Sequence, residues 1–405
     1  MDSLITAAAR ALAAGDPLGA LNRIALRKDA PALALRGIAM AQLGDFAKAK
    51  DLVRAAAKAF GARESVARAR CIVAEAELAL ASRDLGWPLK NLAAARAVLE
   101  THGDRLNAAH GRYVEIRRML LLGQLDDAER LLRELDPSPL PLALQATHEL
   151  IAAGIAIRRI HTAPARAALD RAMNAARLAG IPALIAEIES AALILNAPAA
   201  RLIAPGGTCL VRLDEVEDVF ASNTLVVDAC RYVVRSQGGI VPLTGRVVLF
   251  TLARALAEAW PSPVSRDDLI RRAFRLKVDD SLRARLRVEI GRLRKALKVH
   301  ARIDATSQGF QLAPLHARQV AVLARPMEEE HAAVLAFLAD GESWATSALA
   351  LALGVSQRSV QRALDELAAA GKVQSYGAGR AKRWMTPPLP GIATTLLLPA
   401  PLPGN

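Results

Sequence analysis

The stretch Ser281–Leu297, SLRARLRVEIGRLRKAL, predicts one long helix with chemically different faces. Apolar residues recur every three or four positions, the period of a buried helix face: Leu282, Leu286, Ile290, Leu293 and Leu297. The opposite face carries a crest of four residues bordered by arginine side chains: Ala284, Val288, Gly291 and Lys295, with Arg283, Arg285, Arg287, Arg292 and Arg294. Small crest residues allow close approach, and flanking guanidiniums suit the phosphates beside a DNA groove. We interpret the stretch as a DNA-contacting helix; the alternative is a solvated amphipathic helix with a basic outer face.

The sequence around this helix predicts the other elements of a small α+β domain. They are a strand at 225–234, a turn at 238–239, a strand at 240–243, a helix at 246–259, a helix at 266–274 capped by Ser265, and closing strands at 301–306 and 309–312. Ser307, Gln308 and Gly309 are typical of a hairpin turn between the closing strands. Strands, three helices with the basic one last, and a hairpin together indicate a winged helix-turn-helix.

In five segments this region resembles the OmpR/PhoB type of winged-helix effector domain. The segments, within residues 222–314, are LVVDACRYVV, LTGRVVLF, VSRDDLI, GRLRKAL and IDATSQGFQL. In that family the third helix lies in the major groove of DNA. The resemblance therefore implies DNA contacts from the corresponding positions: base contacts from Arg283, Arg285, Arg287 and Val288, phosphate contacts from Arg292 and Arg294, and neighbouring contacts from Gly291, Lys295 and the wing residues Ser307 and Gln308.

The chain departs from the family pattern at positions that matter for base recognition. Ala284 stands where many members have Arg, Arg287 where Asp is usual, and Glu289 where His is frequent. The wing is shorter and offers Gly309 where the family commonly has an Arg between two glycines. We therefore expect DNA binding without the family's sequence preference. We expect no phosphorylation switch, because the chain has no receiver domain with a phosphoacceptor Asp.

From Asp2 to about Asn196 the chain is rich in Ala and Leu and predicts helices interrupted by Gly, Pro and Asp. A turn followed five residues later by Ala recurs in three clear pairs and two weaker copies: Gly15 and Ala20, Gly44 and Ala49, Gly123 and Ala128, then Ala94 and Ala167. The spacing is close to the ~34 residues of tetratricopeptide repeats, and a small Ala lets the two helices of a hairpin pack closely.

The segment therefore resembles a degenerate tetratricopeptide solenoid. Such stacks bind a protein, a peptide or a small ligand on a concave surface. A purely structural or dimerising helical domain is the alternative. We interpret the histidines of this segment as surface or packed residues rather than ligands: His102, His110, His148 and His161.

Two stretches are interpreted as linkers on either side of the winged helix: 198–207, which contains Pro198, Pro205, Gly206 and Gly207, and 314–326, which begins and ends with Pro. A third domain follows, with a helix at 329–341 and two helices within 346–373. Gly354 is placed at the turn between them and Ser356 as the cap of the last helix. Six residues form the expected apolar skeleton of a helix-turn-helix: Leu349, Leu353, Val355, Val360, Leu364 and Leu367.

The phrase GVSQRSVQRALDEL (354–367) resembles the small winged-helix domains of bacterial regulators. The resemblance implies DNA contacts from the last helix and from a wing formed by YGAGRAKRW: Gln357, Arg358, Ser359 and Arg362, then Arg380, Lys382 and Arg383. Residues 321–405 carry seven basic and seven acidic side chains, so protein docking or dimerisation is the alternative. The Pro-rich tail at 387–405 is expected to be poorly ordered.

Composition favours a nucleic-acid partner. The chain has 53 Lys and Arg against 40 Asp and Glu, and residues 201–320 hold 20 basic and 12 acidic side chains, +8 of the total +13. It contains no uncharged apolar run of about 18 residues and no secretory leader, so we expect a cytoplasmic protein without a membrane partner. Cys71, Cys209 and Cys230 lack metal-binding spacing, and no catalytic motif stands out. We therefore expect no enzyme activity, no metal and no cofactor.

Together these observations predict a mainly α chain, in which an N-terminal helical-repeat (tetratricopeptide-like) domain precedes two winged helix-turn-helix (α+β) domains. The expected ranges are 1–197, 208–316 and 326–386, with a tail at 387–405. The favoured function is a bacterial transcription regulator whose repeats receive a protein or ligand signal and whose winged helices bind promoter DNA. Expected partners are double-stranded DNA, RNA polymerase, the unidentified partner of the repeats and a second copy of the chain. The alternative is a non-catalytic scaffold or adaptor that uses all three domains for protein–protein contacts.

Overall fold

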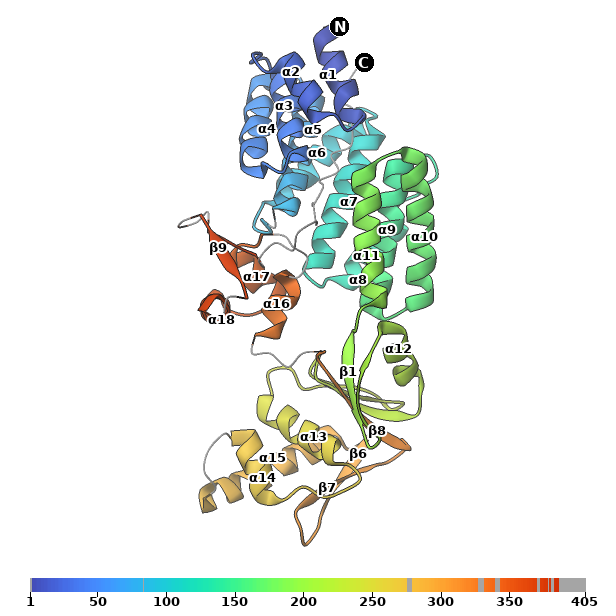
Figure 1. Ribbon diagram of the computed structural model, residues 1–405, viewed down its shortest axis with the longest axis vertical. Coiled ribbons are helices and arrows are strands. Elements are labelled where there is room, and N and C mark those ends of the chain that lie inside the picture. Colours follow the sequence, from blue (N-terminus) through green and yellow to red (C-terminus); the bar gives the residue numbers. More distant parts are fainter. Residues whose placement is uncertain are drawn as a thin grey trace. The chain divides into compact units, whose positions relative to one another are not determined.

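A computed structural model of the chain describes residues 2–82, 84–274, 279–326, 331–338, 343–369, 372–377, 379 and 382–385. Over these residues the chain is mainly helical, with small β-sheets (Figure 1). It divides into two compact units. The first contains residues up to 192 except 160–162, together with the described residues from 333 onward; the second contains 160–162 and 193–332. Among the described helices, none combines the length and the apolar composition needed to cross a bilayer.

The N-terminal part of the first unit is a series of helical hairpins. Its helices are α1 (Ser3–Ala13), α2 (Pro17–Ile24), α3 (Ala30–Gln42), α4 (Phe46–Phe60), α5 (Ser65–Ala81), α6 (Leu89–Thr101), α7 (Arg105–Leu121), α8 (Leu125–Arg133), α9 (Leu142–Arg159), α10 (Thr162–Ala179) and α11 (Pro182–Asn196). Consecutive helices pack together from α1 to α9, and so do α1 with α3, α3 with α5, α5 with α7 and α7 with α9. Clusters of buried side chains span α1 to α3, α3 to α5, α5 to α7 and α7 to α9, and so connect each hairpin to the next.

The three clear turn-plus-Ala pairs mark the starts of second helices, as expected. Gly15, Gly44 and Gly123 lie in the connecting loops with positive φ, where glycine is the favoured residue. Their partners are the fourth residues of α2, α4 and α8, and all are completely buried: Ala20, Ala49 and Ala128. A small side chain at this place lets the two helices of each hairpin approach closely.

The two weaker copies were placed wrongly. Ala94 and Ala167 are exposed, and the equivalent fourth residues of α6 and α10 are the buried Leu92 and Ala165. In an Ala-rich helix several frames contain Ala at the expected spacing, so spacing alone selected the wrong residue. Leu92 also shows that the position does not demand a small side chain in every hairpin.

The second unit is built on a sheet that the sequence only partly revealed. In the described chain its strands are β1 (Ala200–Ala204), β2 (Gly207–Val211), β3 (Thr224–Asp228), β4 (Val233–Ser236), β5 (Gly239–Pro242) and β8 (Gln319–Ala324), in the order β2-β1-β8-β3-β4-β5. Helix α12 (Leu213–Ala221) connects β2 to β3. Strand β8 runs antiparallel to β1 and parallel to β3. Its continuous apolar run is typical of a strand buried inside a sheet.

Both linker interpretations are therefore wrong. Pro205 and Gly206 form the turn of the β1–β2 hairpin, and the stretch 314–326 contains all of β8. The run 225–234 also differs from the single strand expected, because it covers most of β3, a turn and the start of β4. The Asp228 side chain stabilises that turn by accepting hydrogen bonds from the backbone N–H groups of Cys230 (2.9 Å) and Arg231 (3.1 Å).

The predicted helices and closing hairpin of this unit are confirmed. They are α13 (Val247–Ala259), α14 (Arg266–Phe274), α15 (Asp280–Ala296), β6 (Ala301–Ala305) and β7 (Phe310–Pro314). As expected, the Ser265 hydroxyl accepts a hydrogen bond from the Asp268 N–H (3.1 Å) at the start of α14. One hydrophobic core joins these helices to the sheet and to the hairpin.

The hairpin is fixed to the segment that precedes α14. Backbone hydrogen bonds join Val264 and Phe310 in both directions, at 2.8 and 3.0 Å. Gly309, with φ of 154°, lies so close that a Cβ atom there would be 1.9 Å from the Val264 carbonyl oxygen. Only glycine therefore fits at this end of the hairpin turn.

The C-terminal part of the first unit contains α16 (Ala332–Leu338), α17 (Thr346–Leu353), α18 (Gln357–Ala369), β9 (Gln374–Tyr376) and β10 (Arg383–Met385). Gly354 is left-handed (φ 65°) and the Ser356 hydroxyl accepts a hydrogen bond from the Ser359 N–H (3.1 Å), which confirms the predicted turn and cap. Val355 is exposed and Leu353 only half-buried, so the expected apolar skeleton is wrong at these two positions; the core instead includes Trp344 and Trp384. The ends of the helix expected at 329–341 and the tail at 387–405 lie outside the described residues.

We predict that Gly309→Ala destabilises the second unit by about 3 kcal/mol or more, from overpacking and backbone strain. Gly291→Ala is the matched control, since Gly291 lies in α15 and a Cβ atom added to it would have no neighbour within 4 Å. That change should be neutral or stabilising by about 0.5–1 kcal/mol. Calorimetric unfolding of the two variants measures the difference. Equal unfolding temperatures would contradict the assigned role of Gly309.

Candidate nucleic-acid interface

The N-terminus of α15 is set by a side-chain cap. The carboxylate of Asp279 accepts hydrogen bonds from the Leu282 N–H (2.7 Å) and the Ser281 hydroxyl (2.8 Å). These bonds, the backbone one foremost, hold the pKa of Asp279 below its usual range. An acidic cap here and the basic Arg294 and Lys295 in the last turn both complement the helix dipole.

The predicted faces of α15 are confirmed. All five residues of the apolar stripe are buried: Leu282, Leu286, Ile290, Leu293 and Leu297. All four crest residues are exposed: Ala284, Val288, Gly291 and Lys295. Val288, a large apolar residue, is 55% exposed. Because burying each large apolar side chain contributes about 1.5–3 kcal/mol, the core fixes which side of α15 faces outward.

Two arginines in the N-terminal half of α15 have partners within the protein. The guanidinium of Arg283 lies 3.3 Å from Asp280 and 3.6 Å from Asp267, and its side chain is half-exposed. The guanidinium of Arg285 lies 4.8 Å from the ring centre of Phe274. Arg283 is therefore held toward α14, and Arg285 is stacked on the last residue of that helix.

The arginines in the C-terminal half also have partners. Arg292 Nη1 donates to the Glu289 carboxylate at 2.9 Å, although the Arg292 side chain remains 64% exposed. Arg294 Nε donates to the Ile303 carbonyl oxygen at 2.7 Å and so fastens α15 to β6. Exposed Arg292 is available to an external anion, whereas Arg294 also stabilises the hairpin.

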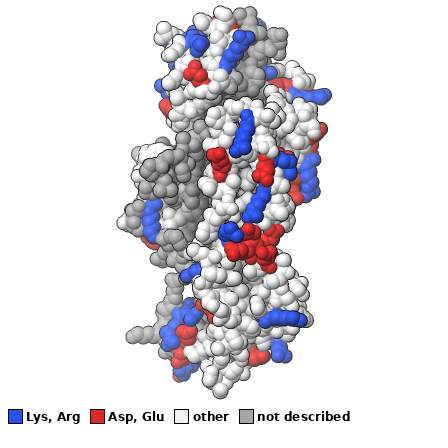
Figure 2. Space-filling model, turned by 45° about the vertical axis from the view of Figure 1, so that its right-hand side comes forward, with Lys and Arg blue, Asp and Glu red and all other residues white. Residues whose placement is uncertain are grey.

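Arg287 and Lys295 differ from the other basic residues of α15. Within the residues that the structure describes, neither makes an ion pair or a side-chain hydrogen bond. The helix has six basic and two acidic side chains, a net charge of +4. Figure 2 shows that basic side chains commonly lie beside acidic ones on the face it presents. Among the arginines of α15, Arg287 alone makes no ion pair, side-chain hydrogen bond or ring contact within the described residues.

The hairpin turn lies beside α14. Ser307 and Gln308 are exposed at its tip. Arg266 Nη2 donates to the Thr306 carbonyl oxygen at 3.1 Å, a contact that sequence spacing did not indicate. The Thr306 hydroxyl closes the turn by accepting from the Gly309 N–H at 3.0 Å.

A separate basic surface lies in the first unit. Gln357, Arg358, Ser359 and Arg362 are exposed on the first turns of α18. Arg362 lies 3.8 Å from Glu366, while Lys382 lies 4.1 Å from the ring centre of Trp384. Arg383 is half-buried on β10, and Arg380 lies outside the described residues. These residues belong to a different unit from α15, so they form a second candidate surface.

The histidines of the helical hairpins lie as interpreted, exposed or packed. His102 and His161 are exposed. His110 is buried and bonded to the Glu77 carboxylate at 2.9 Å. His148 is half-buried and bonded to the Tyr113 hydroxyl at 3.2 Å, and burial lowers its pKa.

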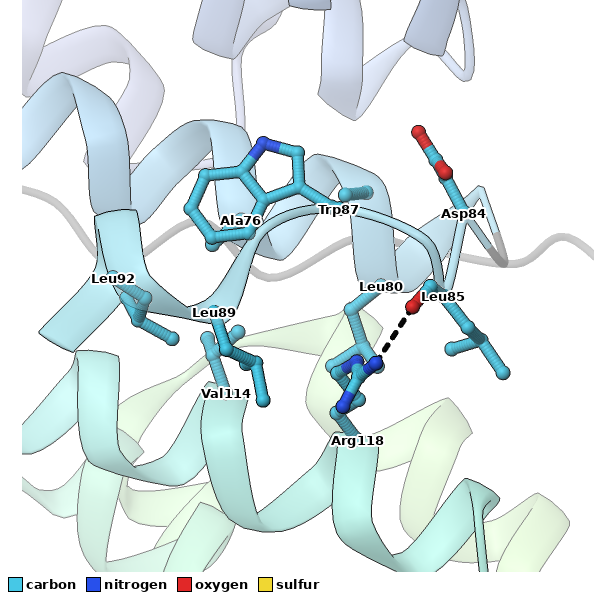
Figure 3. A pocket seen from close by; sticks show the side chains of 10 residues that line it. Ala76, Leu80, Asp84, Leu85, Trp87, Leu89, Leu92, Val114 and Arg118 are labelled. Atoms are coloured by element: carbon cyan, nitrogen blue, oxygen red, sulfur yellow. Dashed lines mark hydrogen bonds between the residues drawn. The ribbon is translucent and has the colours of Figure 1, made fainter. Parts of the chain in front are cut away.

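A small cavity lies among α5, α6 and α7 (Figure 3). Its lining is mainly apolar, and Arg118 Nη2 closes one side by donating to the Leu85 carbonyl oxygen at 2.7 Å. The space open to the centre of a water molecule is about 10 Å³, roughly what a single water requires. The cavity is too small for a substrate or cofactor.

Comparisons with protein-family models, with curated proteins and with solved structures found no match to this chain. The family resemblances therefore stand on the quoted sequence segments alone. The function is inferred from the residues and geometry of the chain itself.

His300 joins the base of the hairpin to the sheet. It is buried between α15 and β6, and its Nδ1 lies 2.7 Å from the Ser236 hydroxyl. Burial lowers the pKa of His300 below the ordinary value of 6.5. The folded chain therefore binds the proton less readily than the unfolded chain.

We predict that the second unit loses stability as pH falls from about 6.5 toward the lowered pKa of His300, because the unfolded state takes up the proton first. Above that range both states are neutral and the full stability is present. In His300→Gln this contribution disappears, while His148 is unchanged in both proteins. Thermal unfolding of both proteins between pH 7.5 and 5 tests this, and parallel pH profiles would refute it.

Proposed function

We propose that this chain is a non-catalytic, DNA-binding transcription regulator that uses α15 as its main DNA contact. The observation that carries the proposal is the outer face of α15, a helix of net charge +4 whose orientation is fixed by five buried apolar residues. The crest residues are exposed, and arginine side chains border them on both sides. This arrangement suits a helix lying in the major groove with phosphates on both sides.

The surrounding elements support an OmpR/PhoB-like winged helix. Helices α13, α14 and α15 precede the β6–β7 hairpin, as in that architecture, and Arg294 and Arg266 fasten the hairpin beside the helices. In this proposal the hairpin is the wing, and Ser307 and Gln308 at its tip contact the DNA backbone. Cytoplasmic location and contact with RNA polymerase belong to the same proposal.

Gly291 supports the proposal independently of charge. A glycine inside a helix costs about 0.5–1 kcal/mol relative to Ala, and here a Cβ atom would meet nothing within 4 Å. Internal packing therefore gives no reason for glycine at this place. Close approach of an external surface, such as a groove of DNA, does.

We further propose that the helical hairpins, similar to tetratricopeptide repeats, receive the regulatory signal from a protein or a small ligand. Their first helices pack in succession from α1 to α9, which is how such repeats build an extended binding surface. Dimerisation through the same hairpins is compatible with this role.

A protein-docking function is the second candidate, and the C-terminal part favours it. Leu351, Val355 and Tyr376 are large apolar residues that are each about half exposed there, at 51%, 49% and 51%. Exposed apolar side chains are typical of protein contacts, whereas Arg358 and Arg362 favour DNA. If protein docking holds for the whole chain, the protein is a scaffold or adaptor.

The first test of DNA binding is its salt dependence. We predict that the full chain binds random duplex DNA and that Arg292→Ala with Lys295→Ala weakens binding to all sequences alike. Loss of two phosphate contacts should reduce the slope of log K against log salt by about 1.8. Arg130→Ala with Arg133→Ala, on exposed positions of α8, is the control and should change nothing. Fluorescence anisotropy measures all three proteins; absence of wild-type binding at low salt would favour the scaffold.

The role of the C-terminal part is decided by footprinting. If α18 contacts DNA, Arg358→Ala with Arg362→Ala should shorten the protected region on a bound duplex without changing the part protected by α15. The double variant at Arg292 and Lys295 should instead weaken protection over the whole site. An unchanged footprint would assign the C-terminal part to protein docking.

A further inference from the structure

The three arginines in the N-terminal half of α15 differ in whether they have a partner within the protein. Arg283 is paired with two carboxylates and Arg285 is stacked on Phe274. Arg287 has no such partner within the described residues, and its side chain is exposed. Its full set of donors is therefore available to an external acceptor.

The residue beside Arg287 is unusual for an exposed helix face. Val288 is 55% exposed, although valine is a poor helix former and gains nothing from contact with water. Its neighbours one turn away on the crest are Ala284 and Gly291, the smallest side chains of the helix. Residues three and four apart are neighbours on a helix surface, so these two leave both Arg287 and Val288 uncovered.

Resting on the proposed function, we propose that Arg287 and Val288 are the residues of α15 that read DNA sequence. Arg287 recognises a guanine, because the guanidinium fork donates two hydrogen bonds that match guanine O6 and N7 in the major groove. Val288 contacts the 5-methyl group of a nearby thymine, an apolar contact suited to its side chain. Arg283 and Arg292, each held by an internal carboxylate, contact phosphates.

The assignment is tested by selecting binding sites for the full chain from a random duplex library. The wild-type sites should contain a preferred guanine with a preferred thymine near it. Arg287→Ala should lose the guanine preference, a change of about 5-fold to 150-fold in relative affinity at that position, and keep the others. Arg287→Lys should also lose it while retaining the salt dependence, because lysine keeps the charge but not the fork.

Arg283→Ala is the matched control, because Arg283 lies one turn before Arg287 on the same side of the helix. It should lower the affinity for all sequences equally and leave the selected site unchanged. For Val288, replacing the preferred thymine by deoxyuridine removes only the methyl group. This should weaken wild-type binding several-fold and leave binding by Val288→Ala unaffected.

The outcomes separate this inference from the proposed function. Sequence-specific binding that keeps its guanine preference in Arg287→Ala overturns the inference and leaves DNA binding intact. Binding without any sequence preference does the same. If the wild-type chain binds no duplex at low salt, both fail. Circular dichroism of each variant establishes that it is folded.

Discussion

The apolar stripe of α15 is the contact on which the candidate interface depends. Leu282, Leu286, Ile290, Leu293 and Leu297 enter the core shared by the sheet, by α13 and α14 and by the hairpin. Turning the helix about its axis would expose these side chains, at about 1.5–3 kcal/mol each. The same packing that stabilises the unit therefore determines which side of the helix remains outside. The arginine side chains that border the crest therefore lie on the solvent side of the helix.

Features that depend on residues close together in the chain could be predicted from the sequence. The period of the apolar residues in α15, the capping residues Ser265 and Ser356 and the left-handed Gly354 depend on neighbours within a few positions, and each was found as expected. The turn-plus-Ala pattern succeeded where a glycine marked the loop. It failed at Ala94 and Ala167, where composition offered several equivalent choices.

The pairing of strands that are far apart in the chain could not be predicted from the sequence. Strand β8 lies between β1 and β3 although it follows them by about a hundred residues, and prolines on either side of it suggested a linker. Internal partners in the candidate interface were hidden for the same reason. The contact of Arg283 with Asp267 joins two helices, and that of Arg294 with the Ile303 carbonyl joins a helix to a strand. Periodicity shows which side chains are exposed but not which of them are already engaged.

The position of β8 also bears on how the second unit is assembled during synthesis. Strands β1 and β2 and strands β3 to β5 are translated first, yet no backbone hydrogen-bond ladder joins the two groups except through β8 in the part of the chain that the structure describes. The helices α12 to α15 and the β6–β7 hairpin leave the ribosome before this strand does. Because β8 is the strand that pairs with both groups, the six-stranded sheet cannot be completed until residues near Ala324 have been synthesised. In the completed sheet the first and last strands of the unit are neighbours, and Arg201 pairs with Ala324. The unit can therefore reach its full fold only after its last strand is made.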